Sequence, residues 1–237
     1  MKILAIGNSF STDATRYLHA LGNAAGVKLK VVNLFIGGCS LRTHYINATE
    51  DKRAYSMEFN GQATGFYVSI KEALCSDEFD VVTVQQCSHQ SFDYKSYQPY
   101  LDYLASYIRK YAPHARIAVH KTWAYEEHSA RLESVSYASR GQMFTDLSAA
   151  YEKAAEAIGA DLIIPAADLV ERLSANGLRA HRDTFHLSLG IGRFAVAALW
   201  LKVLTGVDPT GIRIPLDVEI TDEEIDLVFR SLGEVSL

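Results

Sequence analysis

The chain has 237 residues, of which 49% are hydrophobic and 22% charged, with a formal net charge of −5. This balance is that of an ordinary globular protein, and no Lys/Arg-rich run is present, so nucleic acid and anionic membranes are disfavoured as partners. The cysteines Cys39, Cys75 and Cys87 show no CxxC spacing, which argues against a disulfide framework and a cysteine zinc site. We expect one domain over residues 1–237, and the oligomeric state stays open.

The first segment is an apolar run, Ile3 to Ile6, which predicts a short buried strand. It stops at Gly7, and a helical pattern begins near Asp13. Lys2 leads straight into this run with no signal peptide visible, so we expect a cytoplasmic protein, or a secreted one if a signal peptide has been removed. A strand that turns directly into a helix places the turn at the carboxyl edge of a sheet, where ligands bind in open α/β folds.

The rest of the chain alternates strand and helix patterns. Further strands are expected at residues 28–35, 80–84, 116–120 and 161–164, and helices at residues 14–25, 68–74, 99–111, 142–158, 165–174 and 187–204. Asn60-Gly61 lies between two alternating runs and predicts a hairpin that leaves the main sheet. Thr221 to Glu224 forms a capping box for a final helix. The pattern predicts a three-layer α/β/α fold, with a flavodoxin-like, parallel five-stranded sheet and a β-hairpin excursion.

Three polar loops follow the first three strands, at residues 7–11, 37–40 and 85–91. Right-handed crossovers bring such loops to one edge of the sheet. Ser9, in the first loop, is a candidate nucleophile that needs a base. Among eight histidines, His186 stands out because Asp183 precedes it by three residues, a spacing at which a carboxylate can accept the Nδ1 proton of the imidazole. His120 ends a strand and is a second histidine that can face the site.

Taken together, these segments resemble the SGNH/GDSL hydrolase superfamily, and most of all a bacterial branch of it, DUF4886. The likeness rests on residues 3–13, 80–91, 120–125 and 182–190 and covers the chain from residue 3 to about 206. It implies a triad of Ser9, His186 and Asp183, with the backbone N–H groups of Ser9 and Gly38 in an oxyanion hole.

One departure concerns the third oxyanion donor. The superfamily usually has Gly-x-Asn-Asp after the third strand, where this chain has Gln85-Gln86-Cys87-Ser88-His89. Either glutamine or His89 can supply an N–H group, and strand alternation lets only one glutamine face the site. We favour Gln86, which is nearer the loop.

The resulting hypothesis is a serine esterase that hydrolyses small acyl esters, acetyl above all and carbohydrate esters among them, through an acyl-enzyme. It needs no metal or organic cofactor, and its expected partner is a small-molecule or carbohydrate ester. Asn8, Trp123 and Tyr125 are expected to line the substrate pocket, although packing explains the two aromatic residues equally well. The alternative is a non-catalytic carbohydrate- or ligand-binding protein on the same scaffold. Nucleotide binding at residues 7–11 is disfavoured, because both phosphate-binding glycine motifs are absent.

Overall fold

A computed structural model describes residues 1–237. Its centre is a seven-stranded sheet of order β4-β3-β2-β1-β5-β6-β7. The five strands from β2 to β7 in this order pair in parallel. They are β1 (Lys2–Gly7), β2 (Lys30–Phe35), β5 (Val81–Val84), β6 (Arg116–His120) and β7 (Leu162–Ile164). The predicted parallel, five-stranded α/β sheet is therefore confirmed.

The hairpin lies elsewhere than predicted. β3 (Tyr55–Phe59) pairs antiparallel with β2 over Val32 to Phe35, and β4 (Gln62–Val68) pairs antiparallel with β3. The hairpin therefore extends the main sheet to seven strands instead of leaving it. The free backbone edge of β2 explains this, because a hairpin alongside supplies the missing ladder partners.

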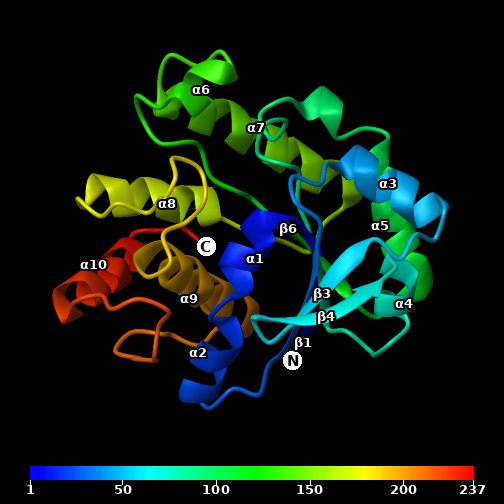
Figure 1. The fold of residues 1–237 in the computed structure, drawn as a ribbon, viewed down its shortest axis with the longest axis horizontal. Helices are drawn as coiled ribbons and strands as arrows, with labels where there is room; N and C mark the ends of the chain where they lie inside the picture. Colours follow the sequence, from blue (N-terminus) through cyan, green and yellow to red (C-terminus); the bar gives the residue numbers. More distant parts are fainter.

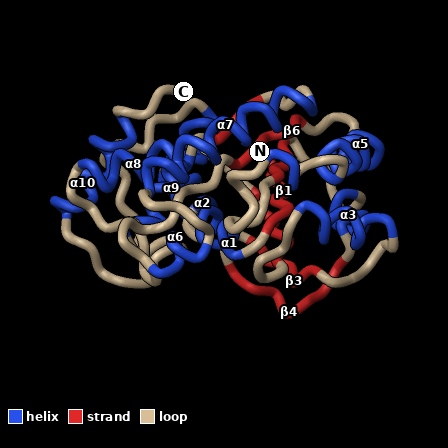
Figure 2. The backbone as a smooth tube through the Cα atoms, turned by 90° about the horizontal axis from the view of Figure 1, so that it is seen from above, coloured by secondary structure: helices blue, strands red, loops and turns tan.

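Helices cover both faces of the sheet (Figures 1 and 2). One layer holds α1 (Ser9–Thr15), α2 (Leu18–Ala24), α8 (Ala166–Ala175), α9 (Ile191–Thr205) and α10 (Asp222–Gly233), which contact one another around α9. The other holds α3 (Leu41–Thr49), α4 (Ile70–Leu74), α5 (Tyr100–Tyr111) and α7 (Arg140–Ile158), with α5 against the other three. A short 3₁₀ turn, Tyr94–Ser96, and α6 (Ala130–Ser134) lie in connecting segments.

Two helices differ from the sequence prediction in ways that matter for the site. The first helix is broken into α1 and α2 and begins at Ser9, four residues before the predicted start, because Asn8 caps it. α3 was not predicted, since its residues mix polar and apolar side chains without a clear period, but Ser40 caps it through its side chain. The predicted capping box at Thr221 is confirmed.

α9 is the central helix of its layer. Every residue from Phe194 to Leu201 is buried in the main hydrophobic cluster. The helix begins at Ile191, four residues later than the predicted start at residue 187, so the preceding segment is a loop that packs on the first turn of α9. No helix of the structure is both long enough and apolar enough to cross a membrane.

Gly192 makes this packing possible and gives a test of it. A Cβ at Gly192 would lie 2.3 Å from the carbonyl oxygen of Ala180 and 2.9 Å from Leu187 Cβ. We expect Gly192→Ala to destabilise the protein by about 1–3 kcal/mol through overpacking. Gly141 holds the same second position in α7 with open space around it, so Gly141→Ala should be neutral or stabilising by up to about 1 kcal/mol. Urea unfolding measures both, and equal effects would contradict the packing account.

Candidate active site

Ser9 lies at the bend between β1 and α1 and is the first residue of the helix. Asn8 caps this helix, with an extended backbone and with its Oδ1 accepting the N–H of Phe10 at 3.0 Å. A Cβ at Gly7 would lie 2.4 Å from Ser11 Oγ and 3.1 Å from Gln85 Cδ, so only glycine fits at the bend. These contacts fix the backbone on both sides of Ser9.

The structure brings Ser9, His186 and Asp183 into one hydrogen-bonded chain. Ser9 Oγ lies 2.8 Å from His186 Nε2, and His186 Nδ1 lies 2.8 Å from Asp183 Oδ2. Because the carboxylate can only accept, Nδ1 carries the proton and Nε2 is left as the acceptor for the Ser9 hydroxyl. A serine, a base and an orienting carboxylate in this order are what activation of a nucleophile requires.

Asp183 and His186 face the same way because of a tight turn. Asp183 Oδ1 accepts the backbone N–H of His186 at 2.9 Å, and Thr184 between them has φ +74°. A β-branched residue seldom adopts this left-handed conformation, so the turn stores strain that its surroundings must hold in place. Part of that support is the N–H of Glu126, which donates to the carbonyl oxygen of Thr184 at 2.7 Å.

The hydrogen bonds also stabilise the charge on Asp183. Partial burial opposes the charge, but donation from the His186 ring and backbone outweighs it, and the pKa of Asp183 is lowered from its ordinary value. A depressed carboxyl pKa keeps Asp183 ionised at neutral pH. The ionised carboxylate can stabilise an imidazolium on His186.

The backbone around Gly38 faces the same bend. Gly38 has φ +61°, a conformation that favours glycine. The N–H groups of Ser9 and Gly38 donate to no group of the protein, so both are free for a ligand. Asn8 Nδ2 donates to the carbonyl oxygen of Cys39 at 3.1 Å and thereby ties the Gly38 loop to the Ser9 bend.

The prediction that Gln86 is an oxyanion donor is wrong. Its Oε1 accepts the N–H groups of Leu41 and Cys87, each at 2.9 Å, and its Nε2 donates to the carbonyl oxygen and the hydroxyl of Ser96. The residue is fully buried with its amide hydrogens committed. Only one of the two glutamines faces the site, as strand alternation requires, but it is Gln85 and not Gln86.

Gln85 belongs to a buried hydrogen-bond network next to the bend that carries Ser9. Gln85 Nε2 donates to Asn8 Oδ1 at 2.9 Å, and Gln85 Oε1 accepts from His120 Nδ1 at 2.7 Å. Burial lowers the pKa of His120 to about 3, so this histidine is neutral and does not face the site as a base. Of the three predicted third donors, His89 alone is exposed with its Nδ1 free of protein partners.

The three residues predicted to line the substrate pocket are buried in the core. Asn8 is 2% exposed, and Trp123 and Tyr125 are 0% exposed. Trp123 stacks on Phe10 with ring centroids 4.2 Å apart and donates Nε1–H to the carbonyl oxygen of Phe185 at 2.7 Å. Tyr125 contacts the Phe185 ring edge-on and donates its hydroxyl proton to Ser88 Oγ. This corrects the prediction, since all three support the site from inside the core.

Asp13 is a residue that sequence reasoning missed. Its side chain is 1% exposed and accepts hydrogen bonds from Arg182 Nη1, Arg193 Nε and the N–H of Leu187, at distances between 2.8 and 3.1 Å. A buried carboxylate needs such partners. The only signal in the sequence was an acidic residue on the apolar side of a helix. In the structure this carboxylate joins α1, which carries Ser9, to the loop that carries His186.

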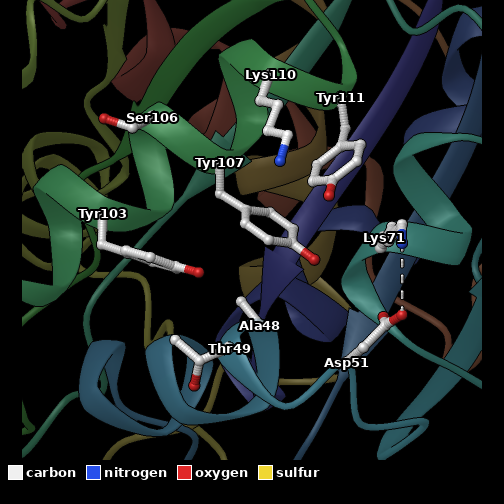
Figure 3. A pocket seen from close by; sticks show the side chains of 9 residues that line it. All are labelled: Ala48, Thr49, Asp51, Lys71, Tyr103, Ser106, Tyr107, Lys110 and Tyr111. Atoms are coloured by element: carbon white, nitrogen blue, oxygen red, sulfur yellow. Dashed lines mark ion pairs between the residues drawn. The ribbon is translucent and has the colours of Figure 1, made fainter.

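Cavities are also present away from this chain of residues. One, of about 410 Å³, opens between α3, α4 and α5 and is shown in Figure 3. It is lined mainly by tyrosines and lysines, among them Tyr103, Tyr107, Tyr111, Lys71 and Lys110. Lys71 pairs with Asp51 at 3.8 Å across its mouth. None of its lining residues touches Ser9, and nowhere do three or more His, Cys, Asp or Glu side chains gather as metal ligands would.

Comparison with known proteins gives the chain its relatives. Residues 2–227 match the family described as Domain of unknown function (DUF4886). A DUF4886 family protein from Bacteroides uniformis is 33% identical, with a TM-score of 0.89 over 98% of this chain and 93% of that chain. No curated protein matches.

Two more distant structures share the fold. A protein from Slackia heliotrinireducens, described as a proposed SGNH hydrolase, is 22% identical with a TM-score of 0.63, covering 86% of this chain and 98% of that chain. A family 3 carbohydrate esterase from Clostridium thermocellum is 16% identical with a TM-score of 0.53, covering 85% and 94%. At these identities the likeness shows the α/β/α fold alone.

The buried ion pairs of Asp13 yield a test of this site's construction. We expect Asp13→Asn to cost about 3 kcal/mol of unfolding free energy, because Arg182 and Arg193 lose the counter-charge of a carboxylate that is 1% exposed. Asp226→Asn, which breaks an exposed pair with Arg213, should cost less than about 1 kcal/mol. Chemical denaturation compares the two. A loss at Asp13 no larger than at Asp226 would contradict the role given to Asp13.

Proposed function

The chain belongs to the DUF4886 family, and on this premise we propose that it is a serine esterase built on the SGNH hydrolase fold. Its substrates are small acyl esters, acetyl esters first among them. The observation that carries the proposal is the hydrogen-bonded chain from Ser9 through His186 to Asp183. A protein that only binds ligands has no need of a base held 2.8 Å from a serine hydroxyl.

In the first half-reaction, His186 Nε2 takes the proton of Ser9 Oγ as the oxygen attacks the ester carbonyl carbon. The carbonyl π electrons move onto the oxygen, which becomes an oxyanion. The N–H groups of Ser9 and Gly38 donate to this oxyanion. When the tetrahedral intermediate collapses, the bond to the alcohol oxygen breaks and His186 returns its proton to that oxygen, which leaves an acyl-enzyme.

In the second half-reaction, water replaces the alcohol. His186 takes a proton from the water as its oxygen attacks the acyl carbon, and the bond to Ser9 Oγ then breaks. The proton passes from His186 to Ser9, the carboxylic acid departs, and the free enzyme is restored. The Asp183 carboxylate holds the imidazole in place and stabilises its charged form in both halves.

Two considerations bear on the substrate. The superfamily resemblance implies short acyl groups, and the carbohydrate esterase from Clostridium thermocellum has the same fold. We therefore include O-acetyl groups on carbohydrates among the proposed substrates. His89 is the side chain proposed as the third oxyanion donor, because both glutamines are committed to other partners.

Turnover of 4-nitrophenyl acetate tests the nucleophile. We expect Ser9→Ala to fall to the background rate, since no other group can form the acyl-enzyme. Ser106→Ala, which alters an exposed serine on α5, should keep the wild-type rate. Equal, background-level rates in wild type and Ser9→Ala would contradict the esterase proposal and favour a non-catalytic binding protein.

Substitution of Asp183 tests the orienting carboxylate. We expect Asp183→Asn to lower kcat by roughly 10³-fold or more, because an amide no longer fixes the Nδ1–H tautomer or stabilises the imidazolium. The same variant should unfold at nearly the wild-type urea concentration at neutral pH, since Asp183 is about half exposed. Wild-type turnover in a folded Asp183→Asn protein would remove Asp183 from the mechanism.

A further inference from the structure

Arg131 stands beside the triad on a segment that the mechanism does not use. It belongs to α6, in the connection between β6 and α7 (Figure 1). Its guanidinium carbon lies 4.3 Å from the ring centroid of Phe185 and 5.7 Å from that of Tyr125. Phe185 in turn has its ring centroid 3.9 Å from that of His186. One phenyl ring therefore separates the guanidinium from the base.

The charge of Arg131 has no carboxylate partner. No Asp or Glu oxygen lies within salt-bridge distance of it, whereas Arg182, Arg193 and Arg140 all pair with carboxylates. The two acids just before α6 are engaged elsewhere: Glu126 binds Arg179 through both oxygens, and Glu127 accepts the N–H of Arg140. The side chain of Arg131 is exposed, so apart from a contact with the Tyr125 hydroxyl its guanidinium donors remain free for a ligand.

The position of Arg131 is well supported. Phe185, on which it lies, is fixed from below by the Trp123 Nε1–H hydrogen bond to its carbonyl oxygen. Beyond α6, the Tyr137 ring contacts Phe92 edge-on, with centroids 5.0 Å apart, and attaches this connection to the segment after β5. His89 comes from that segment, and burial and the charge of Arg131 lower its pKa.

We propose that Arg131 binds an anionic group on the substrate, so that the enzyme prefers esters carrying a carboxylate or phosphate near the scissile bond. The inference rests on the proposed esterase function and adds a substrate class to it. A guanidinium presents a planar set of N–H donors that matches both anions. Stacking on the Phe185 ring fixes the orientation of this plane beside the triad.

The anion can sit on either side of the ester, and matched pairs of substrates separate the two cases. On the alcohol side, 4-acetoxybenzoate is compared with 4-acetoxybenzamide. On the acyl side, the 4-nitrophenyl half-ester of adipate is compared with the 4-nitrophenyl ester of adipamic acid, because half-esters of succinate cleave themselves through the cyclic anhydride. Each pair differs by a carboxylate against a neutral amide of the same shape. We expect kcat/KM to favour the charged member of at least one pair by on the order of tenfold at low salt, from a charge-assisted hydrogen bond.

Variants assign that preference to Arg131. Arg131→Gln should raise KM for the preferred charged ester by about tenfold and leave kcat and the neutral ester unchanged. Arg131→Lys should recover part of the preference, because it keeps the charge but loses the planar set of donors. Arg230→Gln removes an equal charge from the exposed face of α10 and should change nothing. The preference should also weaken as salt rises.

The outcomes separate the inference from the proposed function. Cleavage of all four esters without regard to charge, or a preference that survives Arg131→Gln, overturns the inference and leaves the esterase standing. An equal fall for charged and neutral esters in Arg131→Gln, with a lowered melting temperature, gives Arg131 a structural role and also overturns it. Failure to cleave any of these four esters or 4-nitrophenyl acetate contradicts the proposed function itself.

Discussion

Ser9 and His186 are 177 residues apart in the chain, and their contact depends on the buried carboxylate of Asp13. Asp13 lies one helical turn after Ser9 in α1, and it binds two arginines and a backbone N–H that flank or carry the His186 loop. α1 packs on α9, the helix that follows this loop, and Asp13 adds a link that sets the distance between the two segments. An ionic contact excluded from water does so with an accuracy that a surface pair cannot give.

A second network sets the other side of the bend. The backbone N–H of Phe10 fixes Asn8 Oδ1 as an acceptor, so Gln85 must donate Nε2–H to it and accept from His120 through Oε1. Each amide is thereby oriented by its neighbour. The last link, from Asn8 Nδ2 to the Cys39 carbonyl, holds the Gly38 loop in place. Gln85, which stands where the superfamily has Gly-x-Asn-Asp, thus supports the candidate oxyanion hole through buried hydrogen bonds.

The sequence was a good guide wherever a pattern is local. Apolar runs located the five parallel strands, and Asp183 and His186 were found because three residues separate them. It failed where tertiary context decides. The start of α1 moved because one cap residue outweighs the apolar period, and the hairpin joined the sheet because β2 had a free edge.

The buried residues that support the candidate site could not be identified from the sequence for the same reason. Trp123, Tyr125 and Gln86 stand next to polar loops in the sequence, yet each is turned into the core by partners remote in the chain. Asp13 and Arg131 gave no motif at all, since their importance lies in what surrounds them in space. The catalytic assignment of Ser9, His186 and Asp183 remains a prediction that the geometry supports.

The identity of the residue that a fluorophosphonate modifies tests the central claim most directly. In this reaction the serine oxygen bonds to phosphorus, fluoride leaves, and the hydroxyl proton passes to the imidazole before reaching solvent. The account predicts a single adduct per chain, mapped to Ser9 by peptide mass spectrometry and formed far more slowly in His186→Ala. No adduct, an adduct on another residue, or an unchanged rate in His186→Ala would contradict it.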